Sequence, residues 1–131
     1  MPGSPAAIDR LLEECRRDLR RVAPADLETV AAAGALVVYI RPVEQRSRDG
    51  ELPGAVAVDR NVLEWRLDPT SPHRLPIADV GDRTIVLVCN EGYQSSLAAC
   101  TLQQLGLRHA TDLAGGYQAW VALRPDTERV T

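Results

Sequence analysis

The chain switches between helix-like and strand-like patterns of hydrophobic positions. Over residues 5–22 apolar side chains recur every three or four positions, which is typical of an amphipathic helix. Two continuous apolar runs, ALVVYI at 35–40 and TIVLVC at 84–89, instead suit strands that are covered on both faces, as in a parallel sheet. We therefore predict one helix and two buried strands at these places.

Shorter segments complete the predicted elements. The turn signal Pro53–Gly54 precedes a short apolar run, and Gly115–Gly116 precede an aromatic residue at a helix start. The polar stretch 41–51 is expected to be a loop. The remaining predictions are helices over 24–34, 61–67, 95–105 and 117–123, strands over 55–58 and 109–113, and a surface connection over 68–82.

Strands that alternate with helices indicate an α/β domain. The length of 131 residues suits one hydrophobic core. We expect three layers, with a central, mainly parallel sheet of about five strands and helices on both faces. Ligands of such sheets bind beyond the carboxyl ends of the strands.

Charge limits the partners of the protein. The chain has 15 basic and 18 acidic residues, a net charge of −3, so it lacks the basic excess of a nucleic-acid or membrane-surface binder. Every basic residue is Arg, and the absence of Lys excludes Schiff-base chemistry. Such Arg-rich, Lys-free composition suggests a bacterial source with a GC-rich genome.

The cysteines indicate a reducing compartment. Cys15, Cys89 and Cys100 are odd in number and irregularly spaced, which does not describe a disulfide framework. The N-terminus shows no signal-peptide pattern, so we expect a cytoplasmic protein. His73 and His109 have no metal-ligand spacing, so we expect no metal and assign them no chemistry.

Cys89 stands where the second buried strand ends, six residues before the helix that starts near Ser95. The short connection must curl back on itself, and Gly92 permits the backbone angles of a tight curl. Such a curl directs backbone N–H groups inward and forms an anion cradle. A thiolate, the nucleophilic form of cysteine, would be stabilised there. The predicted cradle comprises Asn90, Glu91, Gly92, Tyr93, Gln94, Ser95 and Ser96.

Four motifs in the right order resemble the rhodanese family of sulfurtransferases, over residues 24–124. The run C-N-E-G-Y-Q-S, 89–95, is similar to the family's C-x-x-G-x-R-S. The strand end at Arg41 is similar to D-x-R, the turn 50–55 to G-H-I-P-G-A, and 113–120 to L-x-G-G with a following aromatic helix start. On this view residues 1–23 form an N-terminal helix packed on the domain, and 125–131 form a C-terminal tail.

The resemblance implies that Cys89 takes sulfur from a small sulfur-containing anion or a persulfide and passes it to a thiol, to cyanide or to a protein. A persulfide would form on Cys89 and be held mainly by the loop N–H groups, with Arg41 shaping the site. The resemblance implies no cofactor.

The chain departs from the family pattern in ways that leave alternatives open. The loop Arg is Gln94, Glu91 adds a negative charge, and the usual Asp and His are Tyr39 and Glu51. A non-catalytic rhodanese-like module with a redox-sensitive Cys89 is the main alternative. A phosphatase or arsenate reductase ranks last, because their related loops are typically one residue longer and end in Arg.

Overall fold

The computed structural model describes residues 6–50, 52–78 and 82–124. Four parallel strands form one sheet in the order β2-β1-β3-β4. The sequence pattern predicts about five strands, whereas the described residues contain four. An isolated parallel bridge between Val22 and Leu113 lies at the β4 edge. The strands are β1 (Leu36–Tyr39), β2 (Val56–Ala57), β3 (Ile85–Val88) and β4 (Ala110–Asp112).

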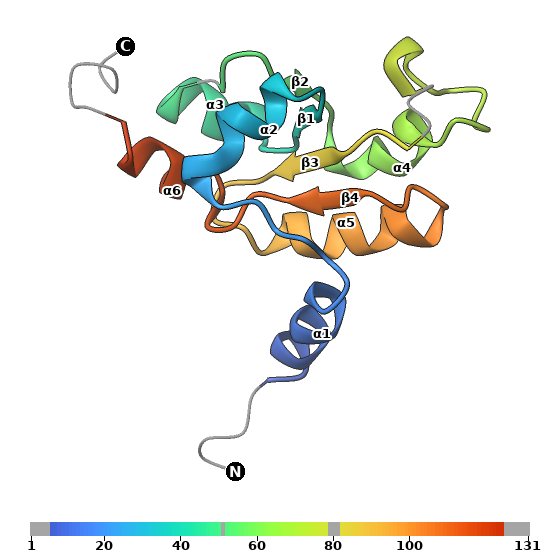
Figure 1. Cartoon of the computed structure of the whole chain (residues 1–131), viewed down its shortest axis with the longest axis horizontal. Helices are drawn as coiled ribbons and strands as arrows, with labels where there is room; N and C mark the ends of the chain where they lie inside the picture. Colours follow the sequence, from blue (N-terminus) through green and yellow to red (C-terminus); the bar gives the residue numbers. More distant parts are fainter. Residues whose placement is uncertain (1–5, 51, 79–81, 125–131) are drawn as a thin grey trace.

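Helices occupy both sides of this sheet (Figure 1). The α-helices are α1 (Ala7–Arg16), α2 (Leu27–Ala32), α3 (Val43–Asp49), α4 (Leu63–Leu67), α5 (Gln94–Gln104) and α6 (Gly116–Ala122). Short 3-10 turns are η1 (Pro24–Asp26), η2 (Arg60–Val62) and η3 (Pro76–Ala78).

Alternate strand residues divide the core into two clusters. Val38 and Leu87 belong to a cluster that includes α4 and α5 side chains, such as Leu102. Val37 and Val86 belong to a second cluster with side chains from α2 and α6. Because successive strand side chains point to opposite faces, a strand must be apolar throughout to fill both clusters. The structure thus confirms the predicted α/β class with helices on both faces of a parallel sheet.

Helix α3 corrects the sequence prediction, which assigned 41–51 to a loop. The helix begins after Pro42 and has Glu44 in its first turn and basic residues in its last. Charges in this order interact favourably with the helix dipole and stabilise the helix. It ends at Gly50, whose φ is 99°. No apolar periodicity marked this helix, so the polar composition was misleading. Glu51 lies outside the described residues.

The first predicted helix is shorter than expected. Helix α1 ends at Arg16, whereas the apolar periodicity continued to residue 22. Val22 is buried, but it leaves the helix because its N–H donates to Asp112 O and its carbonyl accepts from Ala114 N. Segment 17–23 therefore runs from α1 to the β4 edge. The predicted tail, 125–131, lies outside the described residues.

Helix α1 packs on α5, on the side of α5 away from the sheet (Figure 1). Leu12 is buried in this contact region. Burial, with a hydrogen bond to the α5 residue Cys100, raises the pKa of the Cys15 thiol to about 11. Within the described ranges, we find no helix with the length and apolar character needed to span a bilayer.

Candidate active site

The Cys89 sulfur lies in a cradle of backbone N–H groups. Cys89 follows directly after β3, and its side chain is buried. The N–H of Gly92 donates to Sγ at 3.1 Å and the N–H of Ser95 does so at 3.4 Å. The thiol in turn donates to Ser95 Oγ at 3.3 Å. Two inward N–H groups stabilise negative charge on the sulfur without requiring a side-chain cation.

A glycine contact holds the cradle against the start of α6. A Cβ on Gly92 would lie 2.8 Å from Gly115 N, and one on Gly116 would lie 2.6 Å from Cys89 O. Both positions also have positive φ, 88° and 65°, which L side chains rarely adopt. The motif L-A-G-G, 113–116, therefore lets two backbone segments approach within van der Waals contact.

The first residues of α6 bind the carbonyls at the start of the loop. Tyr117 N donates to Cys89 O at 2.9 Å, and Gln118 N donates to Asn90 O at 3.1 Å. These two carbonyls are thereby directed to α6. The carbonyl and the N–H of a trans peptide point in opposite directions. The N–H groups of Asn90 and Glu91, which belong to the same two peptides, therefore point away from α6.

Behind the loop lies a buried carboxylate. Asp112, the last residue of β4, has no solvent exposure. Its Oδ2 accepts from Ser95 Oγ and from Ser96 Oγ, each at 2.7 Å. The Cys89 thiol, the Ser95 hydroxyl and the Asp112 carboxylate thus form a continuous hydrogen-bond chain.

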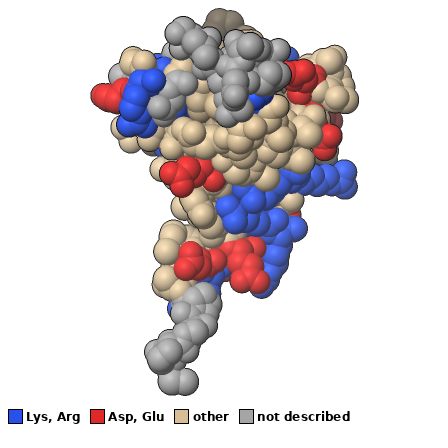
Figure 2. Space-filling model, turned by 90° about the vertical axis from the view of Figure 1, so that its left-hand side faces the viewer, with Lys and Arg blue, Asp and Glu red and all other residues tan. Residues whose placement is uncertain are grey.

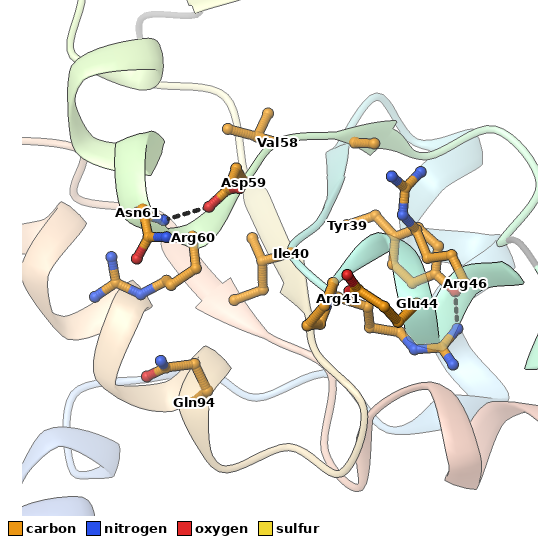
Figure 3. Close-up of a pocket in the computed structure, with 12 residues that line it drawn as sticks. Tyr39, Ile40, Arg41, Glu44, Arg46, Val58, Asp59, Arg60, Asn61 and Gln94 are labelled. Atoms are coloured by element: carbon orange, nitrogen blue, oxygen red, sulfur yellow. Dashed lines mark hydrogen bonds between the residues drawn. The ribbon is translucent and has the colours of Figure 1, made fainter. Parts of the chain in front are cut away.

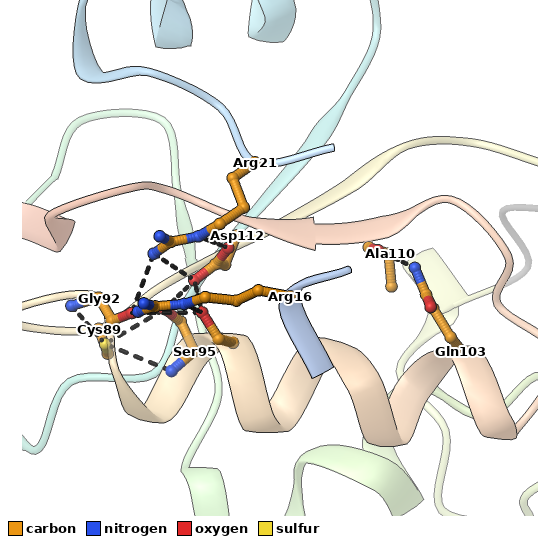
Figure 4. Close-up of polar contacts among 9 residues, drawn as sticks. Arg16, Arg21, Cys89, Gly92, Ser95, Gln103, Ala110 and Asp112 are labelled. Atoms are coloured by element: carbon orange, nitrogen blue, oxygen red, sulfur yellow. Dashed lines mark hydrogen bonds and ion pairs between the residues drawn. The ribbon is translucent and has the colours of Figure 1, made fainter. Parts of the chain in front are cut away.

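Two arginines from the N-terminal segment complete this network (Figure 4). Arg21 Nε donates to Asp112 Oδ1 at 2.9 Å, and Arg16 Nε donates to Ser96 Oγ at 2.9 Å. Both guanidinium groups also donate to the Gly92 carbonyl, Arg16 at 2.8 Å and Arg21 at 3.0 Å. Figure 2 shows arginine side chains gathered where the α1 end of the molecule meets the rest of the domain.

In front of the loop lies a cavity of about 400 Å³, a size that suits a small ligand. Position 94 contributes only a neutral amide to its wall, and Glu91 contributes a carboxylate. The positive charges in the wall come from Arg41 and Arg60. The lining is Ile40, Arg41, Pro42, Gln45, Arg60, Cys89, Asn90, Glu91, Tyr93 and Gln94.

A second cavity, of about 430 Å³, shares five lining residues with the first, among them Arg60 and Gln94. Figure 3 shows the Arg60 side chain extending from η2 above Gln94 at the start of α5. Arg60 Nη1 is held by the Glu64 carboxylate at 2.9 Å. Its buried Nε has no hydrogen-bond partner among the described residues.

Arg41 is committed to the protein itself. Its side chain is buried and donates to the Tyr39 hydroxyl, to Gly50 O at 3.0 Å and to Gln45 O at 3.1 Å. Its guanidinium carbon lies 3.9 Å from the centre of the Tyr117 ring. These contacts connect α3 and the residue that follows it to the strand β1 and the helix α6; the predicted site-shaping role of Arg41 stays a prediction.

The structure separates the predicted loop residues into two groups. Cys89, Asn90, Glu91, Tyr93 and Gln94 line the front cavity, and the Gly92 N–H reaches the sulfur.

Ser95 and Ser96 lie behind the loop instead, with both hydroxyls directed to Asp112. The Ser96 N–H is also occupied, because it donates to Tyr93 O. The N–H and the hydroxyl of Ser96 are thus both directed to protein atoms, and its predicted part in substrate binding stays a prediction.

Four residues around the site were not among those predicted from the sequence: Arg16, Arg21, Asp112 and Arg60. Arg16 and Arg21 belong to a segment with many arginines, and no local pattern distinguishes these two from their neighbours. Asp112 gave one signal, because it is a charged residue inside a predicted strand. Across the described residues, no cluster of three or more His, Cys, Asp or Glu side chains is arranged to hold a metal ion.

Comparison with known proteins identifies the class to which this fold and loop belong. The model of the rhodanese-like domain matches residues 23–123. The chain belongs to the rhodanese-like domain family.

Among curated relatives, the thiosulfate sulfurtransferase GlpE of Stutzerimonas stutzeri (strain A1501) is 27% identical over 103 residues, which cover 79% of this chain and 85% of that protein. A second relative of the same name, from Pseudomonas savastanoi pv. phaseolicola, is 26% identical over 109 residues, which cover 83% of this chain and 93% of that protein.

Two solved structures extend the comparison. The Rhodopseudomonas palustris protein RPA3614, described as a possible tyrosine phosphatase of unknown function, is 33% identical with a TM-score of 0.79 and covers 92% of this chain and 93% of its own. That match reaches beyond residues 23–123. The rhodanese homolog TT1651 of Thermus thermophilus is 34% identical with a TM-score of 0.56, covering 76% of this chain and 99% of its own.

Proposed function

We propose that the protein is a sulfurtransferase that moves sulfane sulfur from a donor to a thiol acceptor through a persulfide on Cys89. The observation that carries this proposal is the Cys89 sulfur, which accepts two backbone N–H groups and lies in the wall of a 400 Å³ cavity. The sulfurtransferase relatives support the same class of reaction.

The chemistry needs no oxidant or cofactor. The Cys89 thiolate attacks the outer sulfur of thiosulfate or of a persulfide, an S–S bond to Sγ forms, and the donor's own S–S bond breaks; with mercaptopyruvate the C–S bond breaks instead and the enolate of pyruvate leaves. With thiosulfate, sulfite leaves with the electron pair. An acceptor thiolate then attacks the outer sulfur of the Cys89 persulfide and regenerates the Cys89 thiolate. The loop N–H groups hold the negative charge in both states.

The front of the cavity bears on the choice of donor. Because Gln94 is neutral and Glu91 is anionic, a dianion such as thiosulfate meets little attraction from the loop side chains. Arg60 and Arg41 are the cations in the cavity wall, and Arg41 already donates to Tyr39, Gly50 and Gln45. This balance favours a persulfide, which carries less charge, over thiosulfate.

Mass spectrometry after incubation with thiosulfate, mercaptopyruvate or an organic persulfide tests the proposal. One additional sulfur atom should appear on Cys89 and disappear in Cys89→Ser, while Cys100→Ser should load normally. If no donor loads sulfur onto an intact thiol, the protein is not a sulfurtransferase and the binding-module alternative replaces it.

A phosphatase is the second candidate, because the Rhodopseudomonas relative is described as a possible tyrosine phosphatase. The loop between Cys89 and Ser96 contains no Arg, and such a residue would be needed to bind a phosphate dianion bidentately. Hydrolysis of p-nitrophenyl phosphate that is lost in Cys89→Ser would favour this candidate. We expect no such hydrolysis.

A further inference from the structure

Arg16 and Arg21 both lie outside the segment that matches the rhodanese-like family model, residues 23–123. They nevertheless reach the most constrained part of the active-site loop. Arg16 comes from the last turn of α1, and Arg21 comes from the segment that joins α1 to the β4 edge. Between them they donate to Gly92 O, Ser96 Oγ and Asp112.

The double contact on the Gly92 carbonyl fixes one peptide of the loop. Two guanidinium groups hold this oxygen from behind, at 2.8 Å and 3.0 Å. The Tyr93 N–H of the same peptide must then point away from both arginines. Tyr93 and its neighbours line the front cavity, so the arginines keep this N–H on the side where an anion would bind.

The same contacts place positive charge behind the sulfur. Arg21 is paired with the buried Asp112 carboxylate, at 2.9 Å, whereas the Arg16 partners at the loop are a hydroxyl and a carbonyl. Two guanidinium groups against one carboxylate leave one net positive charge at the back. The other charged groups around the cavity are Glu91, Arg41 and Arg60.

We propose that Arg16 and Arg21 are positioning residues of the Cys89 loop, and that the N-terminal segment supplies from behind the positive charge that the loop lacks at position 94. This inference rests on the proposed sulfurtransferase function. On this proposal residues 7–22 contribute to the active site, although they lie outside the predicted domain 24–124.

The chain offers matched controls for this test. Arg17 and Arg20 lie beside the two proposed residues in the sequence, carry the same charge and are exposed. Arg16→Gln and Arg21→Gln are therefore compared with Arg17→Gln and Arg20→Gln in the full chain. Arg16→Lys keeps the charge but loses the two-pronged geometry, and it separates the two parts of the proposal.

Two measurements are made on each variant. The first is kcat and KM for sulfur transfer from the best donor. The second is the rate of Cys89 alkylation by iodoacetate divided by the rate with neutral iodoacetamide, measured in a background lacking Cys15 and Cys100. This ratio reports how well the loop accepts an anion, and a loss of overall packing would change both rates together.

We expect Arg16→Gln to lower kcat/KM at least tenfold and the alkylation ratio about fivefold, an effect of the size expected for one lost charge-assisted hydrogen bond. Arg21→Gln should lower both and also reduce thermal stability. Arg17→Gln and Arg20→Gln should stay within twofold of the parent protein. Arg16→Lys should restore the alkylation ratio but only part of kcat.

The proposal is overturned if Arg16→Gln and Arg17→Gln behave alike in both measurements while the protein remains folded. A parent protein that loads no sulfur contradicts the proposed function instead. The alkylation ratio still decides the present inference in that case, because it needs no sulfur donor.

Discussion

The two sides of the Cys89 loop are built in opposite ways. The back is closed, and its polar groups are satisfied: Asp112 is fully buried and receives two hydroxyls and a guanidinium. The front is open to a cavity, and Gln94 and Tyr93 stand exposed there. The contacts that hold the cradle thus lie behind it, while its front faces the cavity.

This contrast suggests why the loop can keep its conformation although Gln94 replaces the Arg of the family pattern. In the family pattern the position of Gln94 carries Arg. Here the peptide of Gly92 is held by Arg16 and Arg21 from the other side. Gln94 takes no part in these contacts, so under the proposed function its replacement would change the charge offered to a donor while the two arginines still hold the loop.

The largest expected effect comes from neutralising Asp112, the carboxylate buried behind the loop. Asp112→Asn leaves Arg21 without its buried partner and disturbs two serine hydrogen bonds. We expect a loss of about 3 kcal/mol in the free energy of unfolding, the size typical of breaking a buried ion pair. Urea denaturation monitored by tryptophan fluorescence measures it.

Asp82→Asn is the matched control, because the Asp82–Arg108 pair at 2.6 Å is exposed on both sides. Exposed pairs contribute little to stability, so the midpoint of unfolding should not change measurably. Equal losses in the two variants would contradict the view that the back of the loop carries the stability of the site.

At the front, Gln94→Arg restores the charge found in the family pattern. We expect kcat/KM for thiosulfate to rise about tenfold, since a charge-assisted contact replaces a neutral one. Gln104→Arg adds the same charge at the other end of α5 and should leave the rate unchanged. An unaltered rate in Gln94→Arg would mean that missing charge does not limit the use of thiosulfate.

Glu91→Gln tests the same face with a smaller change. Glu91 is exposed in the cavity wall, so solvent screens its repulsion of an anionic donor. We expect KM for thiosulfate to fall about twofold to threefold at low salt. The gain should disappear at high ionic strength. A gain that persists there would point to a steric rather than an electrostatic effect.

Much of this architecture was predictable from the sequence. The runs at 35–40 and 84–89 identified β1 and β3 because strands buried on both faces are apolar throughout. The position of Cys89 between a strand and a helix followed from the same patterns. The family motif also marked Gly115 and Gly116 as important positions. The structure shows why, because a Cβ at either position would clash with neighbouring atoms.

The long-range contacts were not predictable in this way. Arg16 lies 76 residues from its partner Gly92 in the sequence, and Arg21 lies 91 from Asp112. Hydrophobic periodicity describes which face of an element is buried, but it does not specify which surface arginine meets which carbonyl. Helix α3 was not predicted for a different reason. Its sequence has no apolar stripe, and the features that favour it are the acidic first turn, the basic last turn, and Pro42 and Gly50 at its ends.

The smallest effect concerns Cys15, which lies next to Arg16 but on the contact between α1 and α5. Its pKa is raised to about 11 by burial and by the hydrogen bond with Cys100. A raised thiol pKa keeps Cys15 protonated at neutral pH, and its thiolate should appear only as the pH approaches 11. At pH 8, iodoacetamide should therefore label Cys89 well before Cys15, and Cys15→Ala should keep the sulfur-transfer rate within twofold.

Peptide mapping at pH 8 and pH 10.5 follows both thiols. If Cys15 is labelled first at pH 8, α1 does not protect it, and the close packing that brings Arg16 to the back of the loop would be contradicted as well.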